Sequence, residues 1–218
     1  MKKNTENLNG RAGFTIIELV ISIFIMSIAV VGIFNAFSIT AVLTSEGADR
    51  LTATYLAQEG MEIITNIRDN NWLRMYNNSV ASGTAGWIAW DNTLSPCEVA
   101  NGGCQVDYTT TGYSTFVPDA YVPGDYLSTP LSNGVGFYGY LGGTPTKFER
   151  KITIACFPNG DCGSGDYIMK VVVKTAWDQK ASIVNKAAKA DSYFSGASVS
   201  NGVTVESTLY DWFNYTNQ

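Results

Sequence analysis

The sequence predicts an α+β fold in which a long N-terminal helix, membrane-spanning in its first half, packs on a C-terminal antiparallel β-sheet. The 27 residues from Leu19 to Ser45 include no charged side chain, and the first proline of the 218-residue chain is Pro96. Three segments after residue 146 alternate apolar and polar side chains, as strands with one buried face do. The stretch between helix and strands is rich in Gly, Ser, Thr, Asn and Tyr, which is typical of a loop-rich insert.

The apolar N-terminal segment is long enough to cross a bilayer. At a rise of about 1.5 Å per residue, a helix over residues 19–43 covers the roughly 30 Å hydrocarbon core. Lys2, Lys3 and Arg11 precede it, so the N-terminus is predicted in the cytoplasm and the remainder outside. A secretory signal peptide has a shorter apolar region, typically of about 7–15 residues. A plain signal anchor fits the length but leaves Glu18 unexplained, because a carboxylate in a membrane segment usually has a function.

The helix is predicted to continue beyond the span and to cover residues 14–69, because no proline interrupts it. Apolar residues at helical spacing form a stripe that is suited to pack on a sheet. The stripe consists of Ala53, Leu56, Ala57, Gly60, Ile63, Ile64 and Ile67. Residues 70–218 then form the globular β-rich domain, with the insert at about 70–146 and the sheet at about 147–212.

Three segments predict the main strands: "KFERKITIAC" (147–156), "YIMKVVVKTAW" (167–177) and "GVTVESTLYDW" (202–212). Their apolar faces hold Phe148, Ile152, Ile154 and Cys156, then Tyr167, Met169, Val171, Val173 and Trp177, then Val203, Val205 and Leu209. Their polar faces hold Lys147, Glu149, Lys151 and Thr153, then Lys170 and Lys174, then Thr204, Glu206 and Thr208. Short β-like pieces also occur in the insert, at 86–90 and 136–141.

Composition excludes some functions. The formal net charge is −5, so the chain lacks the broad basic surface that nucleic-acid binding requires, and no nucleic-acid partner is expected. There is no histidine, which rules out Ser-His-Asp and Cys-His catalysis and His-ligated metal sites. No phosphate-binding glycine loop or nucleophile elbow is present either. We therefore expect no enzyme activity, no cofactor and no catalytic metal.

The stretch "GFTIIELV", from Gly13 to Val20, resembles the class III signal of type IV pilins and type II secretion pseudopilins. The resemblance implies that residues 1–13 are a cytoplasmic leader and that a prepilin peptidase cuts after Gly13. Phe14 then becomes the N-methylated first residue, and the apolar helix stays in the mature protein. It also implies the ladle-shaped pilin fold and partnership with other pilin or pseudopilin subunits, an inner-membrane assembly platform and membrane lipid.

The chemistry of Glu18 supports a role in assembly. Cleavage after Gly13 creates an ammonium group on Phe14, and pairing it with a carboxylate offsets part of the desolvation that both suffer in lipid. Residues 14 and 18 share one helix face, so a pair within one chain is possible. A pair between chains would fix the register of neighbouring helices, and the resemblance favours this second use. Glu18 is therefore predicted to be an assembly residue.

Three functions follow. The first is a minor pilin, a structural subunit of a type IV pilus-like filament, held by a single pass in the inner membrane before it enters the filament. The second is a pseudopilin of a type II secretion pseudopilus in the periplasm. The third, from another class, is a membrane-anchored extracytoplasmic binding protein that uses the N-terminus only as an anchor.

The four cysteines form two local groups, Cys97 with Cys104 and Cys156 with Cys162. An extracytoplasmic domain favours disulfides, and three connectivities are possible. Turn signals lie within each group, "NGG" in the first and "PNGD" in the second, and they favour the two local pairs. A four-cysteine metal site fits the spacings poorly.

Two weaker features can each be explained by structure alone or by a function. Asn159, Asp161, Ser164 and Asp166 could offer oxygen ligands to calcium, but a solvated turn explains them better. Aromatic side chains could line an adhesive face, but core and turn packing is the preferred explanation. These are Trp87, Trp90, Tyr108, Tyr113, Tyr121, Tyr138 and Tyr140.

Overall fold

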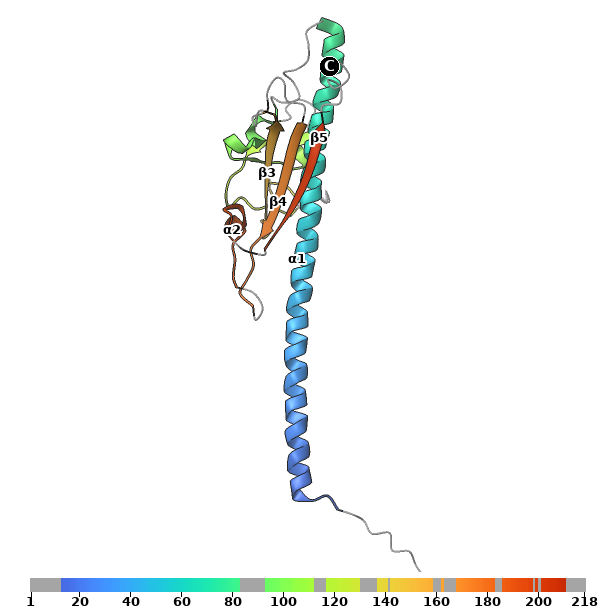
Figure 1. Cartoon of the computed structure of the whole chain (residues 1–218), viewed down its shortest axis with the longest axis vertical. Helices are drawn as coiled ribbons and strands as arrows, with labels where there is room; N and C mark the ends of the chain where they lie inside the picture. Colours follow the sequence, from blue (N-terminus) through green and yellow to red (C-terminus); the bar gives the residue numbers. More distant parts are fainter. Residues whose placement is uncertain are drawn as a thin grey trace, which may run out of the picture. The chain divides into compact units, whose positions relative to one another are not determined.

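The computed structural model describes residues 13–82, 93–111, 117–129, 137–140, 142–158, 162, 168–182, 186–197, 199 and 201–210. The chain divides into two compact units, residues 1–44 and 45–218. The predicted strand piece at 86–90 and most of the possible calcium segment at 159–166 lie outside the described residues. The two units are described one after the other (Figure 1).

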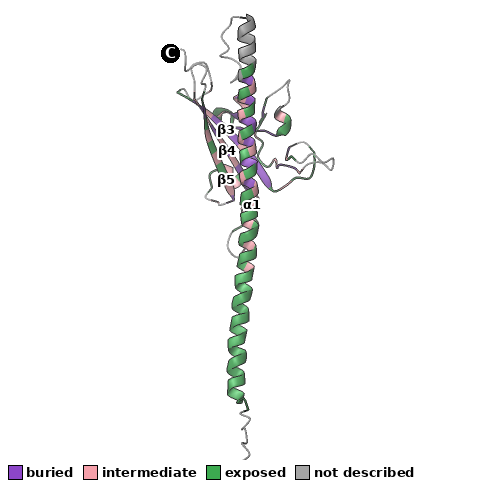
Figure 2. Cartoon of the chain, turned by 90° about the vertical axis from the view of Figure 1, so that its right-hand side faces the viewer, coloured by how far each residue is buried: buried purple, intermediate pink, exposed green. Residues whose placement is uncertain are grey.

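The first unit contains the start of helix α1, which spans Ile16–Ser82 as a whole. None of residues 13–44 is buried, although most of them are apolar. Figure 2 shows this as a surface that is exposed along most of the first half of α1. Of the helices in the described ranges, α1 alone is long and apolar enough to cross a membrane. A helix that is apolar all round needs lipid or other helices around it.

The second unit begins within α1, where the predicted stripe is confirmed. Ala53, Leu56, Ala57, Gly60, Ile63, Ile64 and Ile67 are all buried, and Asn71 extends the buried face by one turn. α1 ends at Ser82 rather than at residue 69, where the sequence predicted its end. Residues 70–82 contain neither proline nor glycine, so nothing local stops the helix there.

A five-stranded antiparallel sheet, in the order β2-β1-β3-β4-β5, packs against this part of α1. The strands are β1 (Cys104–Gln105), β2 (Asp119–Ala120), β3 (Phe148–Phe157), β4 (Ile168–Trp177) and β5 (Gly202–Tyr210). The three long strands lie where the sequence predicts them. β1 and β2 come from the predicted insert, and their two residues each are too short to show a period. Of the predicted piece at 136–141, residues 137–140 are described, and Gly139 forms an isolated bridge with Ser128.

The two faces of the sheet are covered by different elements. Side chains of β3 and β4 that face α1 form one core with its stripe, including Ile152, Ile154, Met169, Val171 and Val173. On the opposite face lies the short helix α2 (Ala190–Phe194), where the Tyr193 hydroxyl is hydrogen-bonded to Thr204 of β5 at 2.8 Å. The described residues also contain three 3-10 turns, η1 (Ser95–Cys97), η2 (Val99–Asn101) and η3 (Tyr108–Thr111).

Two disulfides fasten the loops to this core. Cys97 in η1 is bonded to Cys104 in β1, and Cys156 in β3 to Cys162. These are the two local pairs that the turn signals favoured. The turn of the first pair requires glycine at Gly103, where φ is +93° and an added Cβ would lie 2.7 Å from the Ile152 carbonyl oxygen.

Candidate functional site

The first candidate site is the segment that precedes α1. Gly13, Phe14 and Thr15 are exposed and lie outside the helix, which begins at Ile16. The Phe14 side chain is 82% exposed, and nothing lies within 4 Å of a Cβ built on Gly13. The Gly13–Phe14 bond is therefore open to a peptidase, because proteolysis favours exposed chain outside secondary structure.

Thr15 and Glu18 together form the start of the helix. The Glu18 backbone N–H donates to Thr15 Oγ1 at 3.3 Å, and the Leu19 N–H donates to the Thr15 carbonyl oxygen at 3.2 Å. Threonine three residues before glutamate is the capping-box pattern, which the sequence analysis missed. An acid in the first turn is also favoured by the helix dipole. Glu18 thus sits in a stable place at the helix N-terminus before any partner is considered.

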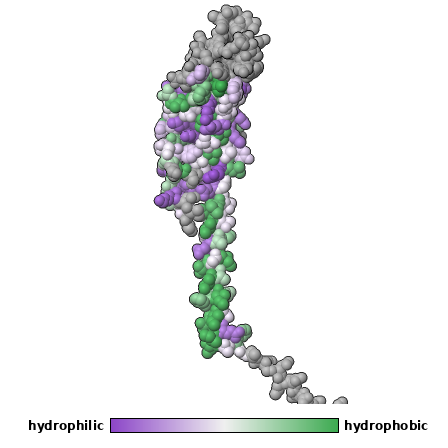
Figure 3. All heavy atoms as spheres, in the orientation of Figure 1, coloured by the Kyte–Doolittle hydropathy of each residue, from purple (hydrophilic) through white to green (hydrophobic). Residues whose placement is uncertain are grey.

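The serine and threonine side chains add little polarity to the helix surface that follows. Hydroxyl groups donate to the carbonyl oxygen four residues earlier, at distances between 2.7 and 3.0 Å, for Ser22, Ser27, Ser38, Thr40 and Thr44. Polar groups satisfied within the helix are compatible with a hydrocarbon surrounding. Figure 3 shows the resulting apolar surface along the first half of α1. Glu18 is the charged residue of this surface, and within the described residues it forms no ion pair.

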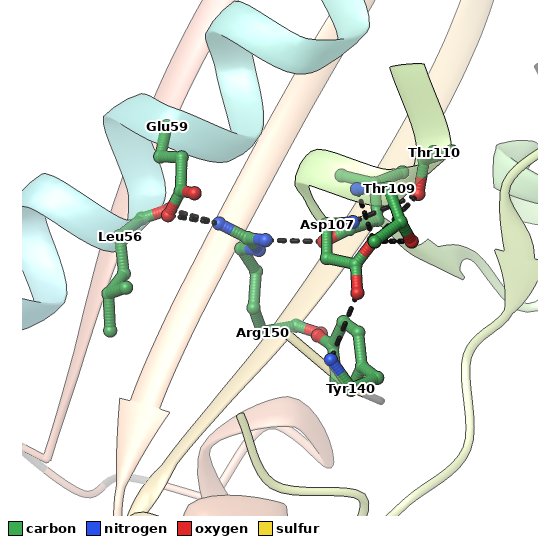
Figure 4. Close-up of polar contacts among 8 residues, drawn as sticks. Leu56, Glu59, Asp107, Thr109, Thr110, Tyr140 and Arg150 are labelled. Carbon is green, nitrogen blue, oxygen red and sulfur yellow. Dashed lines mark hydrogen bonds and ion pairs between the residues drawn. The ribbon is translucent and has the colours of Figure 1, made fainter. Parts of the chain in front are cut away.

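In the globular unit, a buried arginine joins α1 to the sheet (Figure 4). The Arg150 side chain of β3 is fully buried and donates from Nη1 to the Leu56 carbonyl oxygen at 2.7 Å and to Glu59 Oε2 at 3.4 Å. From Nη2 it donates to the Val106 carbonyl oxygen. Gly60 makes room for it, since an added Cβ would lie 3.0 Å from Arg150 Cδ. Arg150 therefore connects the helix, the central strand and the loop after β1.

A second carboxylate fastens the loops beside Arg150. Asp107 Oδ1 accepts from the Thr109 backbone N–H at 2.9 Å, and Oδ2 accepts from the Tyr140 N–H at 3.0 Å (Figure 4). Burial would raise the pKa of Asp107, but the hydrogen bonds from Thr109, Tyr140 and Thr110 outweigh it and lower the pKa. Asp107 thus stays ionised and holds η3 against the 137–140 segment.

On the face of the sheet away from α1, Glu149 is completely buried. Its Oε1 accepts from the Tyr121 hydroxyl at 2.5 Å and from the Gly124 N–H at 3.0 Å, while Oε2 has no hydrogen-bond partner among the described residues. Burial, helped by the nearby Asp191 charge and opposed by the two hydrogen bonds, raises the pKa of Glu149 to about 7. Glu149 therefore changes its charge near neutral pH. The alternation of the strand correctly predicts that Glu149 lies on the polar face of the sheet. It also implies that Glu149 is exposed to solvent, which is wrong.

The buried charges of the globular unit hold its loops and elements in place. The described residues show no group of three or more His, Cys, Asp or Glu that could hold a metal ion. The comparison with known families then bears on the N-terminal segment. Residues 8–34 match the prokaryotic N-terminal methylation motif. Neither a curated protein nor a solved structure matches the chain significantly.

The methylation motif supports the class III signal that the sequence resembles, of the kind found in type IV pilins and pseudopilins. It spans Gly13, Phe14 and Glu18, and the structure brings these three together at the start of α1. The four cysteines lie outside the motif, in the globular unit. The motif, the apolar helix and the α+β layout together describe a pilin-like or pseudopilin-like protein, which suggests a structural role.

The aromatic residues for which packing was preferred over an adhesive face lie in different surroundings. Tyr138 and Tyr140 pack against a buried cluster that includes Leu127 and Trp177, as the packing explanation expects. Tyr121 is half-buried beneath the Lys151 ammonium, which lies 4.6 Å from the ring centroid. Tyr108 is 41% exposed and faces Phe137 across 5.6 Å. Trp87, Trp90 and Tyr113 lie outside the described residues.

Proposed function

We propose that the protein is a minor pilin, a structural subunit of a type IV pilus-like filament. The observation that carries the proposal is the methylation motif at residues 8–34, which ends in a helix surface that is apolar and exposed on every side. Such a surface has to be covered by lipid before assembly and by other helices after it. The globular unit has its own core, so the first half of α1 is left for contacts with other molecules.

The steps of assembly follow from this role. A prepilin peptidase removes residues 1–13 and methylates Phe14, and the protein waits as a single-pass inner-membrane protein with a span of about residues 19–43. The assembly platform then passes it into the filament, beside other pilin subunits. Residues 70–218 form the extracytoplasmic domain, with an insert of about 70–146 before the main part of the sheet. This function involves no catalysis and no cofactor.

Glu18 has the central part in the proposal. In the filament its carboxylate accepts the Phe14 ammonium of a neighbouring chain, which fixes the axial register of the two helices. The substitution Glu18→Ala leaves that ammonium without a partner in an apolar surrounding. Removing one partner of a buried ion pair costs about 3–5 kcal/mol, enough to lower incorporation by roughly two orders of magnitude or more. Membrane insertion should not suffer, since the substitution removes a charge from the span.

The experiment compares the amounts of protein in the membrane fraction and in sheared filaments of the same cells. Glu62→Ala is the matched control, because Glu62 is an exposed acid on the second half of α1. A third variant, Glu18→Gln, keeps a side chain that can complete the capping box but removes the charge. Filament incorporation of Glu18→Ala at the wild-type level would contradict the proposal. A membrane-anchored binding protein would instead be absent from the filaments already as the wild type.

The methylation motif is common to pilins and pseudopilins, so the location of the filament distinguishes the two. A minor pilin should be recovered in filaments sheared from the cell surface, at a small fraction of the main subunit. Recovery only in the periplasm, together with loss of secretion when the gene is deleted, would instead establish a type II secretion pseudopilin.

A further inference from the structure

A cavity of about 680 Å³ opens on the globular unit, between the start of β3 and the segment that follows β4. Three lysines line it, Lys147, Lys180 and Lys189, together with one acid, Asp178. Three of the other six lining residues are alanines, so the cavity combines a partly apolar wall with several positive charges. None of the contacts described above for Glu18, Arg150 or Glu149 involves it.

The one acid of the lining is already engaged. Asp178 Oδ2 accepts from Lys189 Nζ at 2.6 Å, and Oδ1 accepts from the Tyr126 hydroxyl and the Ala190 N–H, both at 3.0 Å. Burial would raise the pKa of Asp178, but the hydrogen bonds from Lys189, Ala190 and Tyr126 lower it. Asp178 therefore stays ionised, and its charge is balanced by Lys189.

The lysines of the cavity outnumber their acidic partners. Lys147 Nζ lies 2.6 Å from Asp49 of α1, which balances its charge. Lys180 forms no ion pair with any described residue, and neither does Lys186, which is exposed beside the lining residue Ala187. Glu46 lies beside the lining as a third acid, so the excess of positive charge is small, and Lys180 and Lys186 are the two ammonium groups here that no described acid pairs with.

The cavity lies close to the place where the chain leaves the membrane. Gln179, which lines it, donates to Glu46 Oε1 of α1 at 3.2 Å. Glu46 is the first charged residue after the apolar span and comes three residues after Leu43. Even a fully extended chain covers only about 11 Å in three residues. The headgroup layer of a bilayer is about 5–8 Å thick on each side, so the cavity is held within or next to it.

We propose that this cavity binds the headgroup phosphate of an anionic phospholipid from the bilayer that holds α1, with Lys180 and Lys186 as the principal ligands. The position favours a lipid over a free anion, because a membrane phosphate is always present at that depth. The alanine lining and Tyr126 give the glycerol part of the lipid an apolar wall. The contact holds the globular unit against the membrane surface until the subunit leaves the bilayer. The inference rests on membrane anchoring and holds for a pilin and a pseudopilin alike.

The test uses the full chain in nanodiscs of phosphatidylcholine, with or without phosphatidylglycerol. The rate at which each lysine is acylated by an amine-reactive reagent is followed by mass spectrometry. A phosphate beside an ammonium stabilises the protonated amine, which does not react. With about 1 kcal/mol for a lysine near an anionic surface, Lys180 and Lys186 should react about fivefold more slowly in the anionic discs. Incorporation into discs is measured first, so that failed anchoring is recognised separately.

Lys170 is the internal control, because it lies near the start of β4, well before the segment that lines the cavity, and is paired with Glu206 at 2.9 Å. Its rate should be equal in both discs. Native mass spectrometry should show phosphatidylglycerol retained by wild type and by Lys170→Gln, and lost by the Lys180→Gln/Lys186→Gln double variant. Equal rates at Lys180 and Lys186 in the two discs would overturn the proposal. Equal slowing by inorganic phosphate in neutral discs would also overturn it, since it would reveal a site for free anions.

Discussion

The two halves of α1 have the same secondary structure and opposite surroundings. In residues 16–44 no side chain is buried, and Ile, Val, Phe and Met side chains are exposed on every side. In residues 45–71 most of the apolar side chains form one stripe that is buried on the sheet, and the exposed face is mainly polar, with Leu51 and Tyr55 as exceptions. The comparison shows that the two halves of α1 are stabilised by different contacts. The second half folds the globular unit, whereas the first half has to find its apolar partners outside the chain.

Among substitutions that affect the second half of α1 and the globular unit, Arg150→Ala is expected to lower stability most. Arg150→Ala removes a buried cation and leaves Glu59 and the Val106 carbonyl oxygen without their donor, which should lower the free energy of unfolding by about 3–5 kcal/mol. Arg150→Met keeps the packing of the stem against Gly60 and should lose less. Urea unfolding of the full chain in detergent, followed by tryptophan fluorescence, measures both. Equal losses in the two variants would show that packing has no share in the effect.

A matched pair of substitutions compares the two halves of α1 directly. Ile64 is fully buried, and Ile64→Ala should lower the free energy of unfolding of the globular unit by about 2–5 kcal/mol. Ile33 is 68% exposed in the first half, and Ile33→Ala should leave that unfolding unchanged. The same urea titration measures both variants. A similar loss in the two would mean that the halves are not independent, which would break the comparison.

The third prediction concerns the face of the sheet that α1 does not cover. The pKa of Glu149 is about 7 in the folded protein, above its unfolded value of 4.5, so the folded state binds more protons between these pH values. The contribution of Glu149 to stability is then fully present below about pH 4.5 and falls by roughly 2–3 kcal/mol as the pH rises to about 7.

Glu149→Gln should remove this dependence on pH. Glu206→Gln should keep it, because Glu206 is an exposed residue of β5. Unfolding titrations at a series of pH values measure it. Stability of the wild type that rises over this range would contradict the assignment to Glu149.

The sequence predicted those parts of the fold that repeat with a regular period. The stripe of α1 and the three long strands were found because every third or fourth residue, or every second, is apolar. Thr15 could have been identified as the helix cap from its spacing to Glu18. The end of α1 was placed too early because its last residues have no period to read.

The buried charges could not be predicted in the same way. Glu149 and Arg150 are adjacent in "FERK", and a run of charged residues in a strand indicates a solvated face. Their burial depends on Tyr121 and on the Leu56 and Val106 carbonyl oxygens, which are far away in sequence. The same holds for the cavity beside β4, whose lysines become a cluster only when the loop after Trp177 folds back toward the start of β3.

The central claim is that the first half of α1 remains in the mature protein and carries the processed N-terminus. Intact mass and N-terminal sequencing of the membrane-extracted protein test it most directly. The account predicts a chain that begins at Phe14, with one methyl group on its amine and the apolar segment retained. A mature N-terminus beyond Val30 would show that the segment is an ordinary secretory signal, and it would contradict the account.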